Sequence, residues 1–511
     1  MLLSSIIPIK SRLQMKEYNI SEIQKLMEGG KITAQQLTKN FLSRIRKLDK
    51  NGPKINAIIE INPEALKIAE NLDEERKNKK VRSPLHGIPV LIKDNITTAD
   101  KMMTTAGSLA LEGYRSTQDA YIIQRLREAG AVILGKTNLS EWANFRSTRS
   151  TSGWSSRGGQ TLNPYVLDRN PCGSSSGSAV AVAANLCVGS IGTETDGSII
   201  CPSNANSIVG IKPSIGLVSR TGIIPISHNQ DTAGPMARTV EDAAIMLTVL
   251  VGPDPEDSFS LMNNNEIPAD YTKFLDINGL QNARIGVARN FFGRNEHVDK
   301  IMENAINIMK THGSIILDPI ELTIVNDLND PEYLVLLYDF KHDMNEFLPK
   351  FVPEEFPQTL SDLIEFNIQK KEKVMPYFGQ EIFKLAEKKG PLTRKEYKSA
   401  LEKCQKLARE EGIDIIIQEN QLDAIIAPSG GPAWLIDHIN GDHSTGGSSS
   451  PAAVAGYPNI TVPAGYVYGL PVGISFFGQN FQEPTLLKLA YAFEQASKAR
   501  QPPKFLNTIK F

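Results

Sequence analysis

The chain is organised around the stretch Cys172-Gly173-Ser174-Ser175-Ser176-Gly177-Ser178, which is followed by a second loop, Gly192-Thr193-Glu194-Thr195-Asp196-Gly197-Ser198. Small residues let two backbone segments approach closely, and neighbouring glycines can turn successive N–H groups toward one point, as an oxyanion or phosphate site requires. Residues 179–188, between the loops, are mostly Ala, Val and Leu, which predicts a short buried helix whose N-terminus faces the first loop. We therefore expect the chemistry of the protein where these two loops meet.

Composition and charge limit the class of protein. The chain has 511 residues, of which 41% are hydrophobic, with 55 basic and 57 acidic residues and a net charge of -2. This balance provides no general attraction to a polyanion, so we expect no nucleic-acid partner. No run of about 18 apolar residues is present, so we also expect no membrane-spanning helix.

The first residues of the chain do not match a secretory signal. The apolar stretch within residues 1–15 has no basic residue before it, contains Pro8 and precedes no convincing cleavage site. We interpret residues 1–15 as a disordered leader and expect a cytoplasmic protein.

Alternating helices and strands predict an α/β fold. Two surface helices are expected in residues 20–48, a charged helix at 63–80 and a further helix at 121–130. Short apolar runs at 87–95 and 131–136 predict buried strands. The first of these strands delivers Lys93 at its end. An ammonium group is costly to bury, so Lys93 either reaches back to solvent or serves as a tuned site group, and the local pattern leaves both open.

The remaining pattern completes this prediction. Further strands are expected at 209–211, 216–218, 222–224, 422–428, 460–462 and 472–477, with helices at 239–250, 333–347 and 484–499. No linker divides the chain, although its length would allow about three domains of roughly 150 residues. We predict one domain over 16–511, with a core at about 81–250, a variable helical segment at about 263–420 and a return to the core at about 421–500.

The four cysteines do not form a recognisable framework. Cys172, Cys187, Cys201 and Cys404 include no CxxC pair and have no histidine at metal-ligand spacing. We expect neither a disulfide framework nor a zinc site, and interpret Cys172 and Cys201 as small packing residues, with a catalytic thiol as the alternative.

Several mechanisms can use Gly/Ser loops of this kind. A phosphate loop would end in Gly-Lys-Ser/Thr, and the lysine is absent after Gly177. A nucleophile elbow centred on Ser175 would follow a strand, whereas residues 163–171 before it have loop character. A flexible linker is disfavoured by the apolar run between the loops. A serine nucleophile with a lysine base fits the residues best, although His228 and His443 are not excluded as bases.

These residues together resemble the amidase signature family. The resemblance rests on Lys93 within 87–95, on the two Gly/Ser loops, and on motifs at 208–220, 230–238, 455–458 and 469–473. It covers nearly the whole chain and is weakest between residues 263 and 420. It implies a single large α/β/α sandwich with a mixed, mostly parallel central sheet covered by helices, and an enzyme that cleaves carboxamide C–N bonds.

The chain departs from the usual family motifs at a few positions. The family usually reads Gly-Gly-Ser-Ser-Gly-Gly and Thr-Asp-Thr-Gly-Gly-Ser-Ile-Arg, whereas this chain has Cys172, Ser176, Glu194, Asp196 and Ile200. With residues 140–145 and 338–341, these departures resemble the bacterial peptide amidases, which release ammonia from the C-terminal carboxamide of peptides. The alternatives are a broad aliphatic or aryl amidase, and the glutamine-hydrolysing subunit of a tRNA amidotransferase.

The resemblance also implies the roles of individual residues. Ser198 is the expected nucleophile, Ser174 the bridging serine with a cis peptide bond before it, and Lys93 the base. The backbone N–H groups of Thr195, Asp196, Gly197 and Ser198 are the expected oxyanion hole. A free lysine titrates near ~10.4, so Lys93 must be desolvated to act as a neutral amine. This chemistry requires no metal or cofactor.

Substrate contacts are expected from Asn144, Asp196 and Trp434. Trp434 is alternatively a packing residue, and Asp196 either accepts a hydrogen bond from a peptide N–H or caps its own turn. We expect the partner to be a small-molecule or short peptide amide, and the protein to be a monomer or a simple homo-oligomer.

Overall fold

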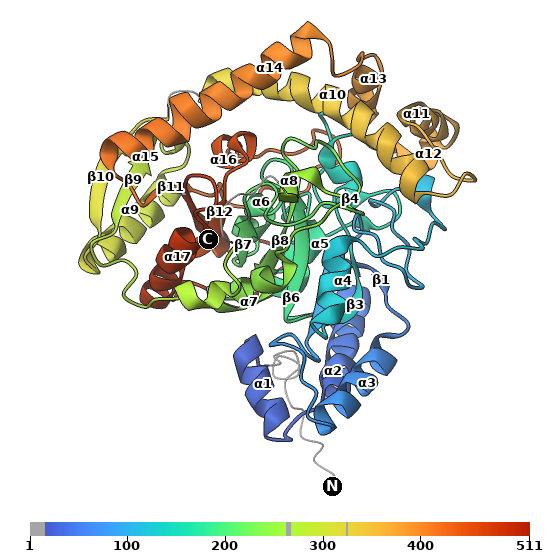
Figure 1. The fold of residues 1–511 in the computed structure, drawn as a ribbon, viewed down its shortest axis with the longest axis horizontal. Coiled ribbons are helices and arrows are strands. Elements are labelled where there is room, and N and C mark those ends of the chain that lie inside the picture. The colour runs from blue at the N-terminus through green and yellow to red at the C-terminus, as the bar shows by residue number, and fades with distance from the viewer. Residues whose placement is uncertain (1–15, 262–266, 323–324, 511) are drawn as a thin grey trace.

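The structure is a computed structural model that describes residues 16–261, 267–322 and 325–510. A large sheet crosses the molecule, with its strands in the order β1-β3-β2-β6-β8-β7-β12-β13-β11-β9-β10 (Figure 1). These strands are β1 (Ile58–Ile61), β2 (Pro89–Lys93), β3 (Val132–Thr137), β6 (Gly189–Glu194), β7 (Val209–Lys212), β8 (Thr232–Ala237), β9 (Arg284–Ala288), β10 (Ile315–Ile320), β11 (Ala424–Pro428), β12 (Asn459–Val467) and β13 (Leu470–Phe477). A small ribbon of β4 (Trp154–Ser155) and β5 (Gly159–Gln160) lies apart from the sheet. The predicted leader, residues 1–15, lies outside the described residues.

The sheet is mixed, as the sequence predicts. Parallel pairing occurs in two blocks, β3-β2-β6 and β11-β9-β10, and the strands between and beside these blocks pair antiparallel. In the first block, α4 (Tyr121–Glu128) connects β2 to β3, because parallel neighbours need a crossover connection. Lys93, at the end of β2, therefore lies in the interior of the sheet rather than at its edge.

Helices cover both faces of the sheet. On β6, the Ser190 hydroxyl donates to the Ser178 carbonyl of α5 (Ser176–Ala183) at 3.0 Å. Gly189, one residue earlier, lies against Met246 of α7 (Val240–Leu250). Successive residues of a strand point to opposite faces, so α5 and α7 lie on opposite sides. The predicted α/β/α arrangement is confirmed.

Helix α5 is the short buried helix that the small residues predict, although it ends at Ala183. All of its residues are buried. A Cβ atom on Gly177 would lie 2.2 Å from the Ala57 carbonyl oxygen and 2.5 Å from that of Asn138. Glycine at this position therefore allows α5 to approach the strand backbone and brings its N-terminus to the first loop.

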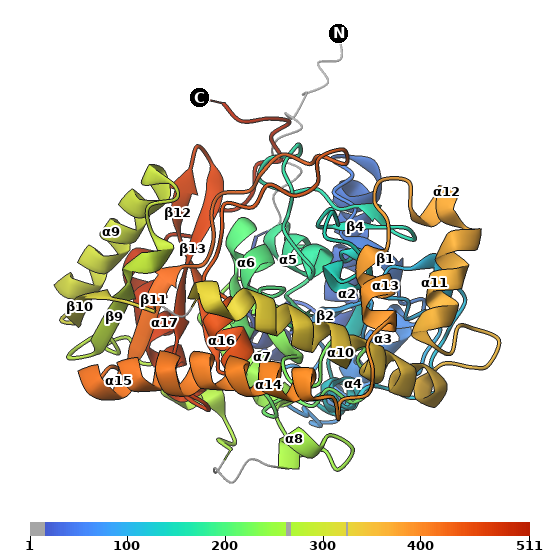
Figure 2. The ribbon, with the colours of Figure 1, turned by 90° about the horizontal axis from the view of Figure 1, so that it is seen from above.

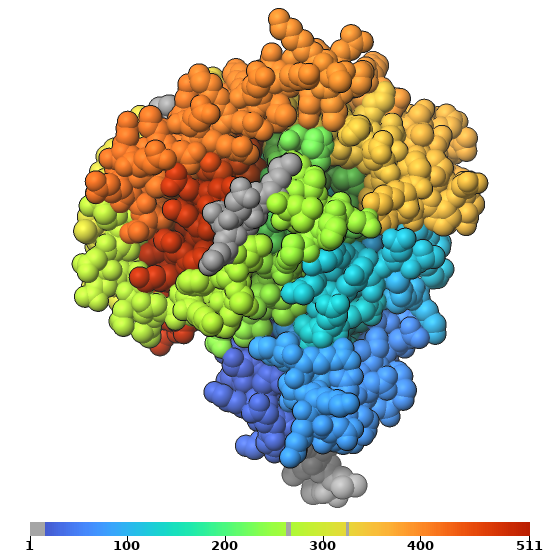
Figure 3. Space-filling model, viewed as in Figure 1, coloured from blue at the N-terminus to red at the C-terminus, as the bar shows by residue number. Residues whose placement is uncertain are grey.

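The other helices largely follow the sequence pattern. They are α1 (Ile20–Glu28), α2 (Ala34–Ile45), α3 (Ala65–Lys77), α6 (Ile200–Ala205), α8 (Ser258–Leu261), α9 (Glu296–Thr311), α10 (Val325–Phe351), α11 (Leu360–Gln369), α12 (Lys371–Val374), α13 (Glu381–Glu387), α14 (Lys395–Gln405), α15 (Ile415–Asn420), α16 (Ser450–Ala455) and α17 (Glu483–Ser497). The N-terminal helices protrude at one end of the molecule, in blue in Figure 3. Among the described residues, none of the helices combines the length and the apolar character of a membrane span.

Residues 325–420 form a helical arm, within which α10 and α14 lie side by side (Figure 2). The segment from 263 to 420 is not wholly helical as predicted, because β9 and β10 extend the sheet from within it. The strands predicted at 216–218 and 222–224 are also wrong. These glycine-punctuated segments form turns with isolated bridges, and the strand after β7 is β8 instead.

Candidate active site

Lys93 is buried in the interior of the protein. Its Nζ donates to the Ser174 Oγ at 2.7 Å, to the Thr193 Oγ1 at 2.8 Å and to the Thr193 carbonyl oxygen at 3.2 Å. The exposed fraction of the residue is 0%. Of the two alternatives left open by the sequence, a lysine that reaches back to solvent is thus excluded.

Burial changes the acid–base behaviour of this amine. Desolvation lowers the pKa of Lys93 to about 7, against the opposing effect of the Asp231 and Glu194 carboxylates. A substantial fraction of the Lys93 side chain is therefore neutral near pH 7.

The first Gly/Ser loop is fixed tightly beside Lys93. The Gly173–Ser174 peptide bond is cis, as the resemblance implies. A Cβ atom on Gly173 would lie 2.2 Å from the Ser140 Oγ. The Ser175 hydroxyl donates to the Thr193 carbonyl at 3.0 Å and accepts from the Thr193 N–H at 3.1 Å. These bonds hold the first loop against the end of β6, where the second loop begins.

The second loop brings Ser198 to the same place. The Ser198 carbonyl accepts from the Ser175 N–H at 3.1 Å, which joins the two loops. The Glu194 carboxylate accepts from the Ile199 and Ile200 N–H groups at 2.7 and 2.9 Å, which closes the loop on itself. Within the described part of the chain, the N–H groups of residues 195–198 have no protein acceptor. They are therefore available to a ligand.

A disulfide bond connects Cys172 of the first loop to Cys201 of α6, the helix that follows the second loop. This corrects the prediction that the two cysteines are packing residues. The two Cα atoms lie 5.9 Å apart, although 29 residues separate the cysteines in sequence. The sequence carries no sign of this proximity, since it arises only when α5 and β6 fold the second loop back onto the first. Cys187 and Cys404 are free and buried.

A cavity of about 420 Å³ opens beside Ser198, a volume typical of small-molecule sites. Residues from both loops line it, including all four positions of the predicted oxyanion hole, Thr195, Asp196, Gly197 and Ser198, as well as the disulfide. The three predicted substrate contacts, Asn144, Asp196 and Trp434, also line this cavity. The fold therefore brings the predicted oxyanion and substrate-binding residues to a single cavity.

The side chains of these three residues are held by neighbours. The Asn144 Nδ2 donates to the Ser150 hydroxyl at 3.1 Å, and the Trp434 Nε1 donates to Asp442 at 3.1 Å. Asp196 does not cap its own turn. Its carboxylate accepts from the hydroxyls of Ser449 and Ser450 at 2.5 and 2.6 Å, and burial raises its pKa. The Gly/Ser run at 446–450 was the only sequence signal for these two serines.

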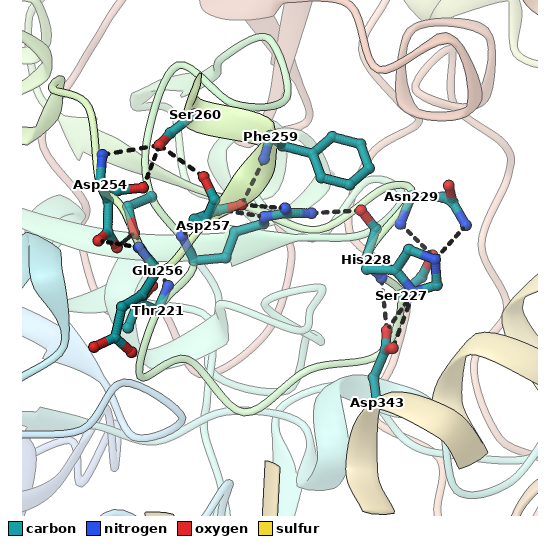
Figure 4. Close-up of polar contacts among 12 residues, drawn as sticks. Thr221, Ser227, His228, Asn229, Asp254, Glu256, Asp257, Phe259, Ser260 and Asp343 are labelled. Carbon is teal, nitrogen blue, oxygen red and sulfur yellow. Dashed lines mark hydrogen bonds and ion pairs between the residues drawn. The ribbon is translucent and has the colours of Figure 1, made fainter. Parts of the chain in front are cut away.

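A second cavity, of about 460 Å³, adjoins the first and shares Ala143, Thr195 and Ile226 with it. His228 lies on its wall, with its Nδ1 2.9 Å from Asp343 (Figure 4). His443 is exposed and lies near Asp437. Neither of these histidines, which the sequence left open as bases, contacts Lys93, Ser174 or Ser198 in the described structure.

Comparison with known proteins agrees with the geometry. A crystal structure of a peptide amidase in complex with the competitive inhibitor chymostatin is 48% identical, covers 96% of this chain and 99% of that chain, and superposes with a TM-score of 0.93. A probable amidase of Arabidopsis thaliana is 43% identical over 98% of this chain and 94% of its own length. A glutamyl-tRNA(Gln) amidotransferase subunit of Thermoanaerobacter pseudethanolicus is 33% identical over 96% of this chain and 99% of its own length.

The fold and these similarities define an enzyme that hydrolyses amides. The family model named Amidase matches residues 36–487, and the chain belongs to this family.

Proposed function

We propose that this amidase hydrolyses the C-terminal carboxamide of peptides, giving the free peptide acid and ammonia. The observation that carries the proposal is the buried 2.7 Å contact between Lys93 and Ser174, on a loop that is joined to the Ser198 loop. The similarity to a peptide amidase that binds chymostatin supports the choice of a peptide amide as substrate.

In the proposed reaction, the Ser198 Oγ attacks the carbon of the substrate carboxamide. Its proton passes to Ser174, while Ser174 passes its own proton to the neutral Lys93 amine. The C–N bond then breaks, and Lys93 returns the proton through Ser174 to the departing nitrogen, which leaves as ammonia. A water molecule hydrolyses the ester on Ser198 by the same relay in the second half of the cycle. No metal or cofactor is part of this scheme.

The N–H groups of Thr195, Asp196, Gly197 and Ser198 are the proposed oxyanion hole. Their lack of a protein acceptor within the described residues supports this role. An oxyanion donor is often worth about 2.7–4 kcal/mol in the transition state. Asn144, Asp196 and Trp434 are the proposed substrate contacts, and the Asp196 oxygens retain lone pairs for a peptide N–H beside their two serine donors.

A second candidate is glutamine hydrolysis in a tRNA amidotransferase, which the similarity to the 33% identical amidotransferase chain supports. A broad aliphatic or aryl amidase would use the same machinery. Both are less well supported than a peptide amidase, since the identity to the peptide amidase structure is 48%.

Three further expectations accompany this proposal. Residues 16–511 are proposed to form one domain, supported by the single large sheet to which both halves of the chain contribute. The enzyme is proposed to act as a monomer or simple homo-oligomer on small amides. A cytoplasmic location stays a prediction, and the Cys172–Cys201 disulfide argues against it, because disulfides persist mainly in oxidising compartments.

The test is ammonia release from an amidated dipeptide, with acetamide and glutamine as competing substrates. Turnover of the dipeptide amide that disappears in Ser198→Ala and Lys93→Ala is the expected result. Lys136→Met is the matched control, because Lys136 is equally buried on the next strand and bonds to Thr104 instead of Ser174. Turnover of acetamide or glutamine in place of the dipeptide amide would overturn the substrate while keeping the chemistry.

A further inference from the structure

Thr195, the first residue of the proposed oxyanion hole, is held at two of its atoms. Its Oγ1 donates to the Asp231 Oδ1 at 2.6 Å, and its carbonyl oxygen accepts from the Gln230 Nε2 at 3.4 Å. Both partners belong to the segment that leads into β8, the neighbour of β6 in the sheet. The Thr195 side chain, and the peptide group between Thr195 and Asp196, are therefore held by residues that lie outside both Gly/Ser loops.

Asp231 is itself fixed by other donors. Its second oxygen, Oδ2, accepts from the Ile226 and Ser227 N–H groups at 2.7 and 3.0 Å. The carboxylate thus closes the turn at residues 226–231 with one oxygen and holds Thr195 with the other. In this arrangement the Asp231 side chain needs two acceptor atoms, one facing the turn and one facing Thr195. A carboxylate supplies both acceptors, whereas an alkyl side chain supplies none.

The 226–231 turn is anchored in turn to helix α10. The Ser227 hydroxyl donates to Asp339 at 2.6 Å, and the His228 N–H donates to Asp343 at 2.7 Å. Figure 4 shows His228 and Asp343 pointing toward each other. The turn is therefore held by α10 as well as by Asp231.

Asp231 also acts on Lys93 by its charge. Burial lowers the pKa of Lys93, and two carboxylates raise it. The larger effect comes from Asp231 and the smaller from Glu194 at the end of β6. Burial raises the pKa of Asp231 to about 6, and the charge of Asp343 from α10 adds to this rise. The same side chain is therefore linked to the proposed oxyanion hole by a hydrogen bond and to the proposed base by electrostatics.

We infer that Asp231 is a positioning residue of the reaction, which aligns the Thr195 N–H with the oxyanion and supplies negative charge to the surroundings of Lys93. This inference rests on the proposed function of Ser198 and Lys93. Among the described residues, Asp231 forms hydrogen bonds with Thr195, Ile226 and Ser227 and none with Lys93, Ser174 or Ser198, so its proposed effects act through Thr195 and through its charge.

Three variants separate the two effects. Thr195→Val removes the hydroxyl and its bond to Asp231 but keeps the carboxylate charge. Thr195→Ser keeps both and is the conservative rescue. Asp231→Asn removes the charge. Its amide oxygen can accept from the Ile226 and Ser227 N–H groups while its Nδ2 donates to the Thr195 Oγ1, so a hydrogen bond on each side can be kept.

The alignment is measured by kcat and KM on an amidated dipeptide. We expect Thr195→Val to lower kcat by about 10- to 100-fold, because a small misplacement of a catalytic group has effects of this size. KM should stay within about twofold, and Thr195→Ser should restore kcat to within about threefold of wild type. A fall in kcat that Thr195→Ser does not reverse would overturn the alignment role.

The charge is measured by the pH dependence of Ser198 labelling with a fluorophosphonate, which needs no substrate. The negative charge of Asp231 favours the protonated form of Lys93. Removing this charge should lower the pKa of Lys93, so that the neutral amine persists to lower pH. We expect the acid limb of the labelling rate to move to lower pH in Asp231→Asn and to move less in Thr195→Val, which keeps the carboxyl group and removes only a hydrogen bond that favours its charged form. His228→Gln is the control for the other titrating group on the 226–231 turn.

The outcomes distinguish this inference from the proposed function. If fluorophosphonate does not label Ser198 in the wild type, the proposed function fails and the inference fails with it. If Ser198 is labelled but the acid limb is the same in wild type and Asp231→Asn, or moves only in His228→Gln, the charge role of Asp231 is overturned while the proposed function stands.

Discussion

The core around β2, α5 and β6 and the helical arm at 325–420 are built from opposite kinds of residue. In the core, every residue of α5 is buried, and a serine and a threonine lie within hydrogen-bond distance of a buried lysine. In α14 of the arm, Tyr397, Ala400 and Cys404 are the buried residues, and most other positions carry long polar or charged side chains. The core depends on close backbone approach, whereas the arm depends on one apolar stripe and a few anchoring carboxylates.

This comparison predicts that the same substitution has different effects in the two regions. The difference is testable with lysines, cysteines and glycines, since each type occurs in both.

The largest expected difference concerns lysine. Lys93→Met should lower kcat by at least about 10³-fold, because removing a member of a catalytic unit has effects of this order or larger. Lys341→Met in the arm removes a donor to the Glu387 and Lys389 carbonyls and should leave kcat within about twofold. Steady-state ammonia release from the dipeptide amide measures both. Equal losses in the two variants would contradict the division between core and arm.

The second difference concerns cysteine. The Cys172–Cys201 bond closes a loop with a sequence separation of 29 residues, and such a cross-link is worth about 3–4 kcal/mol by chain entropy. The double variant Cys172→Ala/Cys201→Ala should lower the free energy of unfolding by up to about this amount, measured by urea denaturation. Cys404→Ala in the arm, which removes one buried sulfur, should have an effect of about 1 kcal/mol. If dithiothreitol left the urea midpoint of the wild-type protein unchanged, this would argue that the disulfide bond does not stabilise the fold.

The third difference concerns glycine. Gly177→Ala should destabilise the protein by about 3 kcal/mol, because its Cβ would meet the Ala57 and Asn138 backbone at 2.2–2.7 Å and a packed core yields little. Gly379→Ala in the arm meets only the end of the Glu381 side chain at 3.4 Å and should be close to neutral. Thermal unfolding of the two purified variants gives the comparison directly. A stable Gly177→Ala protein would show that α5 can move away from the strands.

The smallest expected effect is the pH dependence of the core itself. The proposed reaction needs the neutral Lys93 amine, and burial lowers the pKa of Lys93 to about 7. Below this pH the neutral fraction falls about tenfold per unit, so kcat should fall likewise. A kcat profile without an acid limb between about pH 5 and 7 would exclude Lys93 as the titrating base.

Sequence patterns were sufficient for much of the site because each key residue lies in a short stretch whose own pattern is recognisable. The short apolar run that ends at Lys93 is a strand, and the Ala/Val run after Ser178 begins as a buried helix. The two loops could therefore be recognised without knowledge of their spatial neighbours. The resemblance to a family added the proposed roles of Ser174 and Ser198, which the pattern alone left among several mechanisms.

Contacts between distant segments were not predictable in this way. Ser449 and Ser450 bond to Asp196 from more than 250 residues away, and Asp231 reaches Thr195 across the β6–β8 pairing. β8 itself contains Gly234 and Pro235, which are poor strand formers, and it is a strand because antiparallel partners lie on both sides. In β8, pairing with the neighbouring strands therefore outweighs the weak strand preference of its own residues.

By itself, the sequence determined the residue types, the order of the loops and the depth to which small and apolar residues are buried, since these follow from local spacing and the hydrophobic effect. Only the tertiary structure decided which loops touch. It placed Cys172 beside Cys201, fixed Asp196 and Thr195 through distant partners, and desolvated Lys93 enough to lower its pKa. Proximity between distant residues and burial of a charge are properties of the packed chain, because both arise only when the strands and helices assemble.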